Sequence, residues 1–431
     1  MELKNILRSL SDCPCGHKHT IFTETVQIES GLTARCGQVL KEAGFPGKIL
    51  LVSDENEMRA SNGILESLFS AGFSVKKLIY PDMRLATIEG VREVEALLSD
   101  VDGLLSVGTG SVNDICRVAA FRAKKEFAIF ATAPSMDGFA SDTAPIIENN
   151  FKTSLFAEQP SIILADTRVL AASPAELKTA GFGDMIAKYI GIFDWKLSHL
   201  LTGEYYCPAV AEITMQGVRK VMALADRVTA NDEEAAGSIM QGLVLSGIGM
   251  KLAGCSRPAS GAEHVLSHYW ECYKVARGIW PEFHGKKVGV ASVLINRIYH
   301  HIAERVTEVD PIPDPTDFEE VKKAFDPSQW EELMKLNNPT VTATVDPARL
   351  KAIWPEVRRM IAEMLPGDDE MLSLMRRAGA ATEPADVHVS PELMEKGLRY
   401  HAYMRHRILL TRLLPMLGLD IMDFLTERES A

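Results

Sequence analysis

The segment GAEHVLSHYW (261–270) carries two histidines four residues apart, a spacing that could serve metal binding. On a helix, residues four apart lie on one face about 6 Å apart along the axis, so His264 and His268 could both reach one ion. Val265 follows the first histidine, where the H-E-x-x-H motif of metalloproteases requires a glutamate as general base. The pair therefore does not predict a metalloprotease, and a metal site needs a third ligand from elsewhere.

Two further candidate ligands lie on other predicted helices. Asp184 follows two glycines in GFGDMIAKY, where we expect a break that restarts the helix and directs the carboxylate into a cleft. His284 stands before a glycine at the start of a later helix, and a predicted capping box of Ser260 and Glu263 places His264 in a first turn. One carboxylate and two imidazoles suit Zn²⁺, Ni²⁺ or Fe²⁺ and leave coordination positions open for substrate. Spacing alone leaves open that each histidine is only packed in the core or solvated.

A cluster of soft ligands stands near the start of the chain. Cys13, Cys15, His17 and His19 lie within the seven residues of CPCGHKH and could hold zinc. The pattern C-x-C-x-H-x-H is cramped for one short loop to surround a tetrahedral ion. We expect that replacing both cysteines by serine leaves activity nearly unchanged, because the cluster precedes the first predicted nucleotide-binding strand.

A glycine-containing turn in SVGTGSVNDICR is a candidate phosphate-binding site. A strand runs into Gly108 and Gly110 and a helix opens at once, which lets backbone amides and the helix dipole stabilise a pyrophosphate. The turn follows the third predicted strand and lacks the full G-x-G-x-x-G, so the usual Rossmann fingerprint is absent. A tight turn without a ligand explains the motif equally well.

Two other segments could line the same site. Asp54 ends the strand ILLVSD, where an acid can accept hydrogen bonds from a ribose diol or simply cap the next helix. The segment TAPSMDGFASDTAPI (132–146) is too polar for a core strand and is predicted to be a loop, with Asp137 and Ser141 as candidate ligand contacts. A plain turn remains the alternative.

The elements that would position these residues alternate regularly from Lys48. Short apolar runs (KILLVSD, SVKKLIYP, GLLSVGTG and EFAIFATAP) are separated by helical patterns over 57–71, 88–98 and from 111. This alternation predicts a parallel sheet with helices on both faces. After PSIILADTRVL long helical patterns take over. We therefore predict an α/β dinucleotide-binding domain over 1–170 and an all-α, metal- and substrate-binding domain over 171–431.

Composition limits the class of protein. The chain has 431 residues, 46% hydrophobic and 24% charged, which fits two globular domains. A net charge of −12 argues against nucleic acid or an anionic membrane as partner, so an anionic substrate would need a local basic pocket. The start lacks the apolar core of a signal peptide, and seven cysteines fit a reducing compartment, so we expect a soluble cytoplasmic protein.

Five motifs occur in the same order as in a known group: GTGSVNDI, TAPSMDGFAS, GFGDMIAKY, SRPASGAEHVLSH and HGKKVG. Together they resemble the iron-containing alcohol dehydrogenase and dehydroquinate synthase superfamily, and within it the glycerol-1-phosphate dehydrogenases, especially the bacterial AraM-like branch. The resemblance covers nearly the whole chain. It implies that Asp184, His264 and His284 bind the metal, and that Asp184, His268 and Asp137 contact substrate and take part in catalysis. It also implies a dinucleotide site made of Asp54, Gly110, Ser111, Val112, Asn113, Asp114, Thr132, Ala133, Pro134, Ser135 and Ser141.

The implied reaction is reduction of dihydroxyacetone phosphate to sn-glycerol-1-phosphate. The metal, Zn or Ni with Fe possible, would polarise the ketone while the nicotinamide delivers hydride to carbon 2. NAD should be preferred, with NADP possible, because Asp54 is followed closely by Glu55 and Glu57. We expect a homodimer or higher homo-oligomer. Candidate phosphate ligands are Lys188, Arg257, Lys286 and Lys287, although structural salt bridges would explain each of them as easily.

Three alternatives stay open at this point. The nearest is a glycerol or other small-polyol dehydrogenase with the same metal and cofactor. A dehydroquinate synthase would use the same fold with NAD regenerated internally. A non-catalytic metal or nucleotide sensor is the third.

Overall fold

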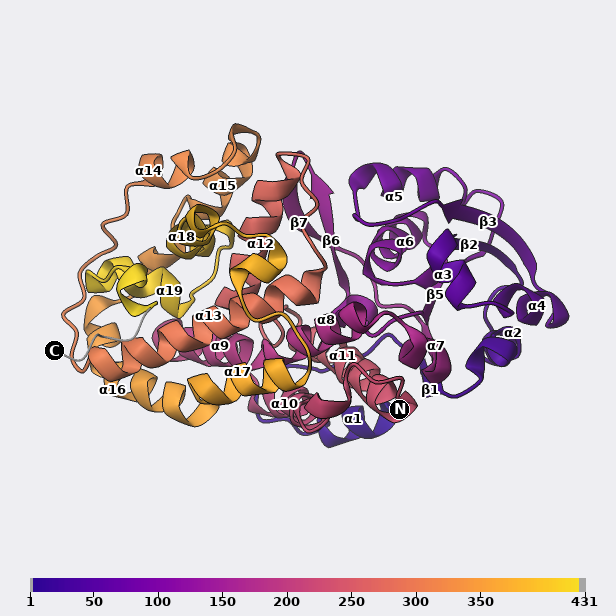
Figure 1. Cartoon of the computed structure of the whole chain (residues 1–431), viewed down its shortest axis with the longest axis horizontal. Helices are drawn as coiled ribbons and strands as arrows, with labels where there is room; N and C mark the ends of the chain where they lie inside the picture. The colour runs from indigo at the N-terminus through magenta and orange to yellow at the C-terminus, as the bar shows by residue number, and fades with distance from the viewer. Residues whose placement is uncertain (1–2, 426–431) are drawn as a thin grey trace.

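The computed structural model describes residues 3–425, which form an α/β half and a helical half (Figure 1). Six strands make one sheet in the order β1-β8-β5-β4-β2-β3, and every pairing in it is parallel. The strands are β1 (Thr25–Glu29), β2 (Lys48–Asp54), β3 (Ser74–Tyr80), β4 (Gly103–Gly108), β5 (Glu126–Ala131) and β8 (Ile162–Asp166). The predicted parallel sheet is confirmed, and β1 adds a strand that the sequence analysis missed.

Helices cover both faces of the sheet because its strands alternate apolar side chains between the faces. Ile49 and Leu51 of β2 pack against α2 (Cys36–Glu42) and α4 (Ile64–Ser70). Leu50 and Val52 pack in the core formed with α5 (Ile88–Glu95) and α6 (Gly110–Ala123). The helix predicted over 57–71 is instead two helices, α3 (Glu55–Ala60) and α4, because the chain turns at Gly63 with φ 96°.

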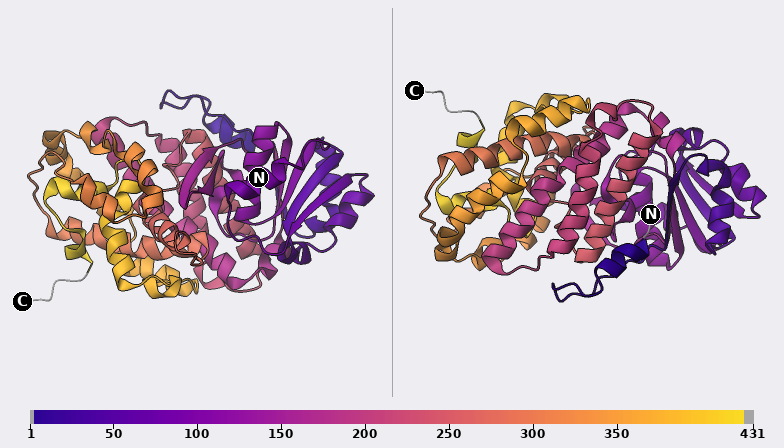
Figure 2. Two further views of the ribbon diagram at one scale, coloured as in Figure 1. Left: turned by 90° about the horizontal axis from the view of Figure 1, so that it is seen from above. Right: turned by 90° about the horizontal axis from the view of Figure 1, so that it is seen from below.

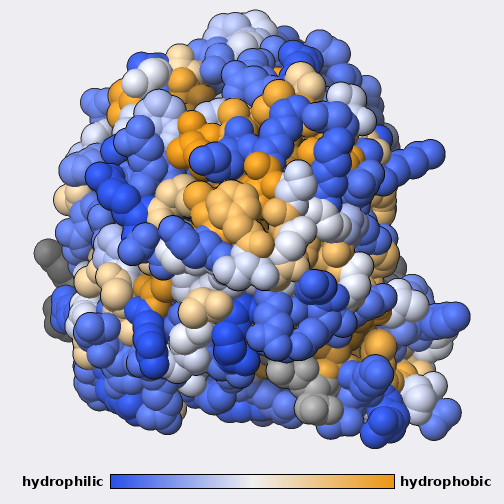
Figure 3. All heavy atoms as spheres, turned by 90° about the vertical axis from the view of Figure 1, so that its right-hand side faces the viewer, coloured by the Kyte–Doolittle hydropathy of each residue, from blue (hydrophilic) through white to orange (hydrophobic). Residues whose placement is uncertain are grey.

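The sheet ends in β3, whose side chains are only partly covered. Figure 3 faces this end of the molecule and shows a hydrophilic surface around a central group of apolar side chains. The strands β6 (Thr143–Glu148) and β7 (Phe151–Phe156) form an antiparallel hairpin that is not part of the six-stranded sheet. The segment 132–146 is therefore only partly the predicted loop, since it contains the turn η2 (Asp137–Ala140) and the first four residues of β6.

The helical half follows the last sheet strand. Its longer helices are α8 (Ala175–Ile186), α9 (Lys188–Thr202), α10 (Pro208–Met222), α11 (Glu233–Ala253), α12 (Ala262–Val275), α13 (His284–Arg305), α16 (Pro347–Met364), α17 (Asp368–Arg377) and α18 (Pro391–Tyr400). The helices of the chain not yet named are α1 (Leu3–Ser9), α7 (Thr167–Ala172), α14 (Phe318–Lys323), α15 (Trp330–Asn337) and α19 (Leu410–Leu413). Within residues 3–425 no helix has both the length and the hydropathy needed to cross a membrane.

The start of the chain lies against the helical half, although we predicted it as part of the α/β domain. His19 bonds through Nδ1 to the carbonyl of Leu252 in α11, 2.8 Å away, and Cys13 lies 3.5 Å from Cys207 at the start of α10. Figure 2 shows this indigo segment along the outside of the helices. The division 1–170 and 171–431 stays a proposal, with the N-terminal segment bridging it.

Candidate active site

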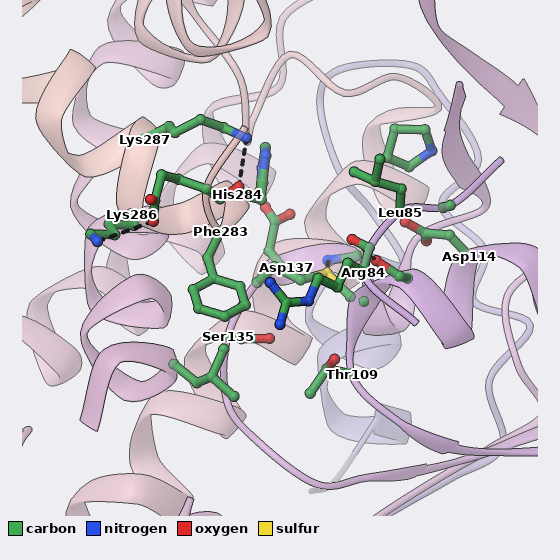
Figure 4. A pocket seen from close by; sticks show the side chains of 18 of the residues that line it. Arg84, Leu85, Thr109, Asp114, Ser135, Asp137, Phe283, His284, Lys286 and Lys287 are labelled. Carbon is green, nitrogen blue, oxygen red and sulfur yellow. Dashed lines mark hydrogen bonds and ion pairs between the residues drawn. The ribbon is translucent and has the colours of Figure 1, made fainter. Parts of the chain in front are cut away.

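A cavity of about 900 Å³ lies between the two halves. One wall is built at the carboxyl ends of β2, β4 and β5, where ligands bind in open parallel sheets, and includes Asp54 and the start of α6. The other wall carries His264, His268 and His284 from α12 and α13. Figure 4 shows His284 and Lys287 on one side of the cavity and Thr109 and Asp114 on the other.

Asp184 and His284 meet because α8 and α13 pack backbone against backbone. A Cβ on Gly285 would lie 2.0 Å from the carbonyl oxygen of Ala180, and a Cβ on Gly183 would lie 2.6 Å from the carbonyl oxygen of Gly285. Such distances leave no room for any side chain, so both positions require glycine. The contact holds the first turn of α13 beside the carboxylate.

The helix that carries Asp184 is continuous, and the predicted break at the glycines is wrong. Gly181 and Gly183 lie inside α8, and the only interruption before α9 is Ala187, whose backbone angles are still helical. The glycines serve close packing instead of interrupting the helix. The predicted cleft-facing carboxylate is also wrong, because Asp184 is fully buried and does not line the cavity.

The ligand atoms of Asp184, His264 and His284 all lie within 4.8 Å of one another. His264 is in the first turn of α12, as predicted, although the cap residue is Gly261. Glu263 accepts hydrogen bonds from the Gly261 N–H at 2.9 Å and from His264 Nδ1 at 2.7 Å. Because Glu263 holds Nδ1, the imidazole presents Nε2 to Asp184 Oδ1, 3.3 Å away. This is the carboxylate–histidine arrangement that orients metal ligands, and the sequence analysis saw Glu263 only as a cap.

A second set shares His284. The ligand atoms of His268, Glu271 and His284 also lie within 4.8 Å of one another. Glu271 is already paired with two ammonium groups, Lys152 at 3.0 Å and Lys287 at 3.2 Å. Burial lowers the pKa of Lys287 to about 8, which still leaves it mostly protonated at neutral pH. This carboxylate and its two lysines carry a net positive charge, which disfavours a cation.

The first set has the opposite charge balance. Lys188 is fully buried between Asp137 Oδ2 at 2.7 Å and Asp184 Oδ1 at 2.6 Å. Two carboxylates and one ammonium leave a net negative charge, which attracts a divalent cation. Although burial raises the pKa of Asp184, Lys188 and His264 outweigh it, so its pKa lies far below the usual value. The Nδ1 atom of His284 is buried and has no hydrogen-bond partner in residues 3–425. Donor types and charge therefore fit a metal at Asp184, His264 and His284.

The candidate phosphate ligands need correction. Lys188 and Arg257 do not line the cavity, because Lys188 sits between its two aspartates and Arg257 bonds to the carbonyls of Asp194 and Ile408. Lys286 and Lys287 do line it. Both are committed to carboxylates: Lys286 pairs with Glu176 and Glu282, and Lys287 with Glu271.

Two guanidinium groups that the sequence analysis did not single out line the same cavity. Arg405 Nη2 donates to the Lys152 carbonyl and to His268 Nδ1, both at 3.3 Å. Arg407 donates to the carbonyl of Ser260 at 3.0 Å and, through its other nitrogen, to a serine hydroxyl. Within residues 3–425 neither arginine pairs with a carboxylate. They come from the segment YMRHR, which the resemblance covered without assigning a role.

His268 lies between the two charged regions. Its ring centroid is 5.7 Å from that of His284 and 6.3 Å from that of His264. Burial, Lys152 and Arg405 lower the pKa of His268 well below its usual value. The neutral ring accepts the Arg405 hydrogen bond at Nδ1, so its proton is on Nε2.

Most of the predicted dinucleotide residues line the opposite wall: Asp54, Gly110, Ser111, Asp114, Thr132, Ala133, Ser135 and Ser141. Val112, Asn113 and Pro134 do not. Val112 packs in the core between the sheet and its helices, and Asn113 is buried in the same helix. The carbonyl of Pro134 faces α8, where a Cβ on Gly181 would lie 1.9 Å away.

The acids after β2 divide their roles. Asp54 caps α3, because it accepts the Glu57 N–H at 2.8 Å and the Met83 N–H at 3.2 Å, and it also lines the cavity. Glu57 turns toward the loop before α6 and accepts the N–H and hydroxyl of Thr109 at 2.6 and 3.0 Å. Burial and Asp54 raise the pKa of Glu57 to about 8. Of the three acids invoked for cofactor choice, Asp54 and Glu57 line the cavity and Glu55 does not.

Comparison with known proteins finds relatives across almost the whole length. A family model described as iron-containing alcohol dehydrogenase matches residues 27–174. The glycerol-1-phosphate dehydrogenase [NAD(P)+] of Geobacillus stearothermophilus is 31% identical over 416 residues, covering 95% of this chain and 96% of the relative. The chain belongs to the glycerol-1-phosphate dehydrogenase family, within the iron-containing alcohol dehydrogenases. The enzyme of the same name from Halalkalibacterium halodurans is 29% identical and covers 94% and 96% of the two chains.

Solved structures share the fold. A probable glycerol dehydrogenase from Sinorhizobium meliloti superposes with a TM-score of 0.60 at 16% identity, over 93% of this chain and 97% of the other. The NADH-dependent butanol dehydrogenase A of Thermotoga maritima superposes with a TM-score of 0.58 at 14% identity, over 93% and 95%. The predicted dehydroquinate synthase-like architecture of an α/β half and a helical half is confirmed.

Proposed function

We propose that this chain is a metal-dependent, NAD(P)-dependent sn-glycerol-1-phosphate dehydrogenase that reduces dihydroxyacetone phosphate. One observation carries the proposal. Asp137 lines one end of the cavity, and the ion pairs of Asp137 and Asp184 with the buried Lys188 give this region a net negative charge. Arg405 and Arg407 line a cationic end, and His268 lines the cavity next to Arg405. A substrate with a carbonyl near one end and a phosphate at the other matches this distribution.

Asp184, His264 and His284 would hold the metal ion, Zn²⁺ or Ni²⁺ with Fe²⁺ possible. A bound divalent ion supplies Lewis-acid polarisation of the substrate carbonyl. Lys188 holds Asp184 and Asp137 together by ion pairs, and the Asp137 N–H donates to Asp184 Oδ2 at 2.9 Å. Glu263 fixes the ring of His264. These contacts orient the donors before any ligand arrives.

The phosphate would bind Arg405 and Arg407. A guanidinium forms paired hydrogen bonds with phosphate oxygens, and these two have no carboxylate to release first. This feature favours a phosphorylated substrate over the alternative, glycerol or another small polyol, for which cationic side chains in the cavity would have no partner.

The dinucleotide would lie along the wall that carries Asp54 and the start of α6. The amides of Gly110 and Ser111 would receive the pyrophosphate at the helix N-terminus. Asp54 would accept from the ribose and disfavour a 2′-phosphate, so we propose NADH as the preferred reductant with NADPH accepted. A nicotinamide held on this wall would supply the hydride for carbon 2 of the ketone.

His268 would serve the substrate oxygen. A neutral imidazole with its proton on Nε2 donates a hydrogen bond, which stabilises the negative charge that develops on oxygen as hydride arrives at carbon 2. Asp137, which lines the cavity beside this group, would contact a substrate hydroxyl. The proton that completes the product would come from water held at His268.

Steady-state rates test the proposal and its alternatives together. Dihydroxyacetone phosphate and unphosphorylated dihydroxyacetone are compared with NADH, before and after chelation and readdition of metal, and the product is assayed with enantiomer-specific enzymes. We expect metal-dependent turnover, a strong preference for the phosphorylated ketone, and sn-glycerol-1-phosphate. Equal rates with both ketones would support a polyol dehydrogenase. Absence of any net change in NADH with either ketone would leave a dehydroquinate synthase or a sensor.

Two predictions concern the whole protein. We propose a cytoplasmic enzyme with no nucleic acid or membrane partner, and a homodimer or higher homo-oligomer. Light scattering of the purified protein measures its mass, and a monomer at all concentrations would contradict the second.

A further inference from the structure

A second group of metal-ligand side chains lies outside the cavity. Cys13 Sγ and Cys207 Sγ are 3.5 Å apart, Cys15 Sγ and His19 Nε2 are 3.2 Å apart, and Cys207 Sγ and His19 Nε2 are 3.9 Å apart. All four ligand atoms lie within 4.8 Å of one another. None of the four residues lines the cavity. Three come from the N-terminal segment, and Cys207 precedes α10.

We propose that Cys13, Cys15, His19 and Cys207 bind a structural zinc ion. A tetrahedral zinc with Zn–S of about 2.3 Å and Zn–N of about 2.0 Å places its ligand atoms about 3.5–3.8 Å apart. The distances in this group lie close to that range. Three thiols and one imidazole form the Cys₃His set of closed structural zinc sites, in which protein atoms fill every position.

The surroundings orient each ligand for a cation. His19 donates from Nδ1 to the carbonyl of Leu252 at 2.8 Å, which leaves the Nε2 lone pair facing the sulfurs. Cys207 is the residue before the first turn of α10, where the helix dipole stabilises a thiolate. Tyr205 donates its hydroxyl to Cys15 Sγ at 3.5 Å. Zinc binding would displace the thiol protons to solvent, so that three thiolates and a neutral imidazole face the ion.

Cys207 resolves the difficulty seen in the sequence. One short loop could not surround an ion with C-x-C-x-H-x-H, but here the loop supplies three ligands and α10 supplies the fourth. His17 is not a ligand, because its ring stacks on Tyr205 with centroids 3.8 Å apart. All seven cysteines are free thiols, and the 3.5 Å between Cys13 and Cys207 is far longer than a disulfide bond of about 2.05 Å. The bound ion would fasten the N-terminal segment to the helical half.

Metal content and cobalt absorption test this site independently of turnover. We compare full-length wild type, the double variant Cys13→Ser/Cys15→Ser, and His264→Ala, all purified with zinc and a reductant. Wild type should hold one more zinc per chain than either variant. The cysteine variant should keep its turnover at low temperature and lose thermal stability, whereas His264→Ala should lose turnover. Cys255→Ser is the matched control, since Cys255 is also a half-buried thiol but lies outside the group, and it should keep full metal content.

Cobalt substitution gives a second measurement, whose main result is obtained on the wild-type protein. Three thiolates should produce an intense sulfur-to-cobalt charge-transfer band in the near ultraviolet, and this band should persist in His264→Ala, because the cavity ligands include no sulfur. Three results would overturn the proposal: a cobalt protein without the band, a double cysteine variant with undiminished zinc, or a Cys13–Cys207 disulfide in protein purified with zinc.

Discussion

Arg405→Met should weaken binding of the substrate phosphate while sparing the rest of the cavity. Methionine keeps much of the apolar stem and removes the guanidinium, which donates to His268 and has no carboxylate partner within residues 3–425. If the phosphate binds there, the variant loses at least one charged hydrogen bond to an anion. The effect should appear as a higher KM for dihydroxyacetone phosphate.

The expected rise in KM follows from the strength of the hydrogen bond between Arg405 and the phosphate. A hydrogen bond to a charged group contributes about 1.5–3 kcal/mol. Since about 1.4 kcal/mol corresponds to a tenfold change in affinity, KM should rise about 10- to 150-fold. Arg405→Lys should recover part of the loss, because an ammonium keeps the charge without the paired geometry. Arg399→Met is the control, as this exposed arginine pairs with Glu395 and Asp420 away from the cavity.

Initial rates with phosphorylated and unphosphorylated dihydroxyacetone separate two roles for Arg405. A phosphate ligand predicts a much larger loss for the phosphorylated ketone than for the unphosphorylated one, together with weaker competitive inhibition by inorganic phosphate. Equal losses of kcat/KM for both ketones, with unchanged phosphate inhibition, would refute the reasoning. That result would mean that Arg405 acts by holding the ring of His268.

Variants of His264 and His268 should differ in their metal content. His264→Ala should lose both the cavity metal and its activity, whereas His268→Ala should keep the metal and turn over at least about 100-fold more slowly than wild type. Elemental analysis of both folded variants decides this, and similar metal loss would make both histidines ligands. Gly285→Ala should lower the free energy of unfolding by about 1–3 kcal/mol in denaturant titrations, because its Cβ would lie 2.0 Å from a carbonyl oxygen of α8. Gly47→Ala, with open space around it, should change little, and equal stability of the two would contradict the packing argument. Asp54→Asn should reduce the ratio of kcat/KM for NADH to that for NADPH, and an unchanged ratio would remove Asp54 from cofactor choice.

Local patterns determined the α/β half well. Buried strands such as Lys48–Asp54 and Glu126–Ala131 are short apolar runs bounded by turns. A helix between two consecutive strands brings the chain back to the same end of the sheet, so the strands run parallel. The separate hairpin and β1 were missed because Thr25–Glu29 and Thr143–Glu148 are short and polar enough to resemble loops. Their strand geometry comes from partners elsewhere in the chain.

The site shows the same division. Ordered motifs identified the three candidate metal ligands and most residues of the dinucleotide wall. The pairing of Lys188 with two aspartates was not visible, because Asp137 is remote in sequence and the charge balance of a group depends on every neighbour it meets. For the same reason Lys188 was mistaken for a phosphate ligand.

The family, the order of strands and helices along the chain, and the residue types able to bind a metal could all be predicted from the sequence, because they depend on composition and on neighbours within a few positions. Which of these residues meet could be learned only from the three-dimensional packing of the chain. Arg405 reaches His268 across 137 residues, and Cys207 reaches His19 across 188. Such contacts arise when helices pack, and packing depends on the shapes of whole surfaces, so no local spacing in the chain encodes them.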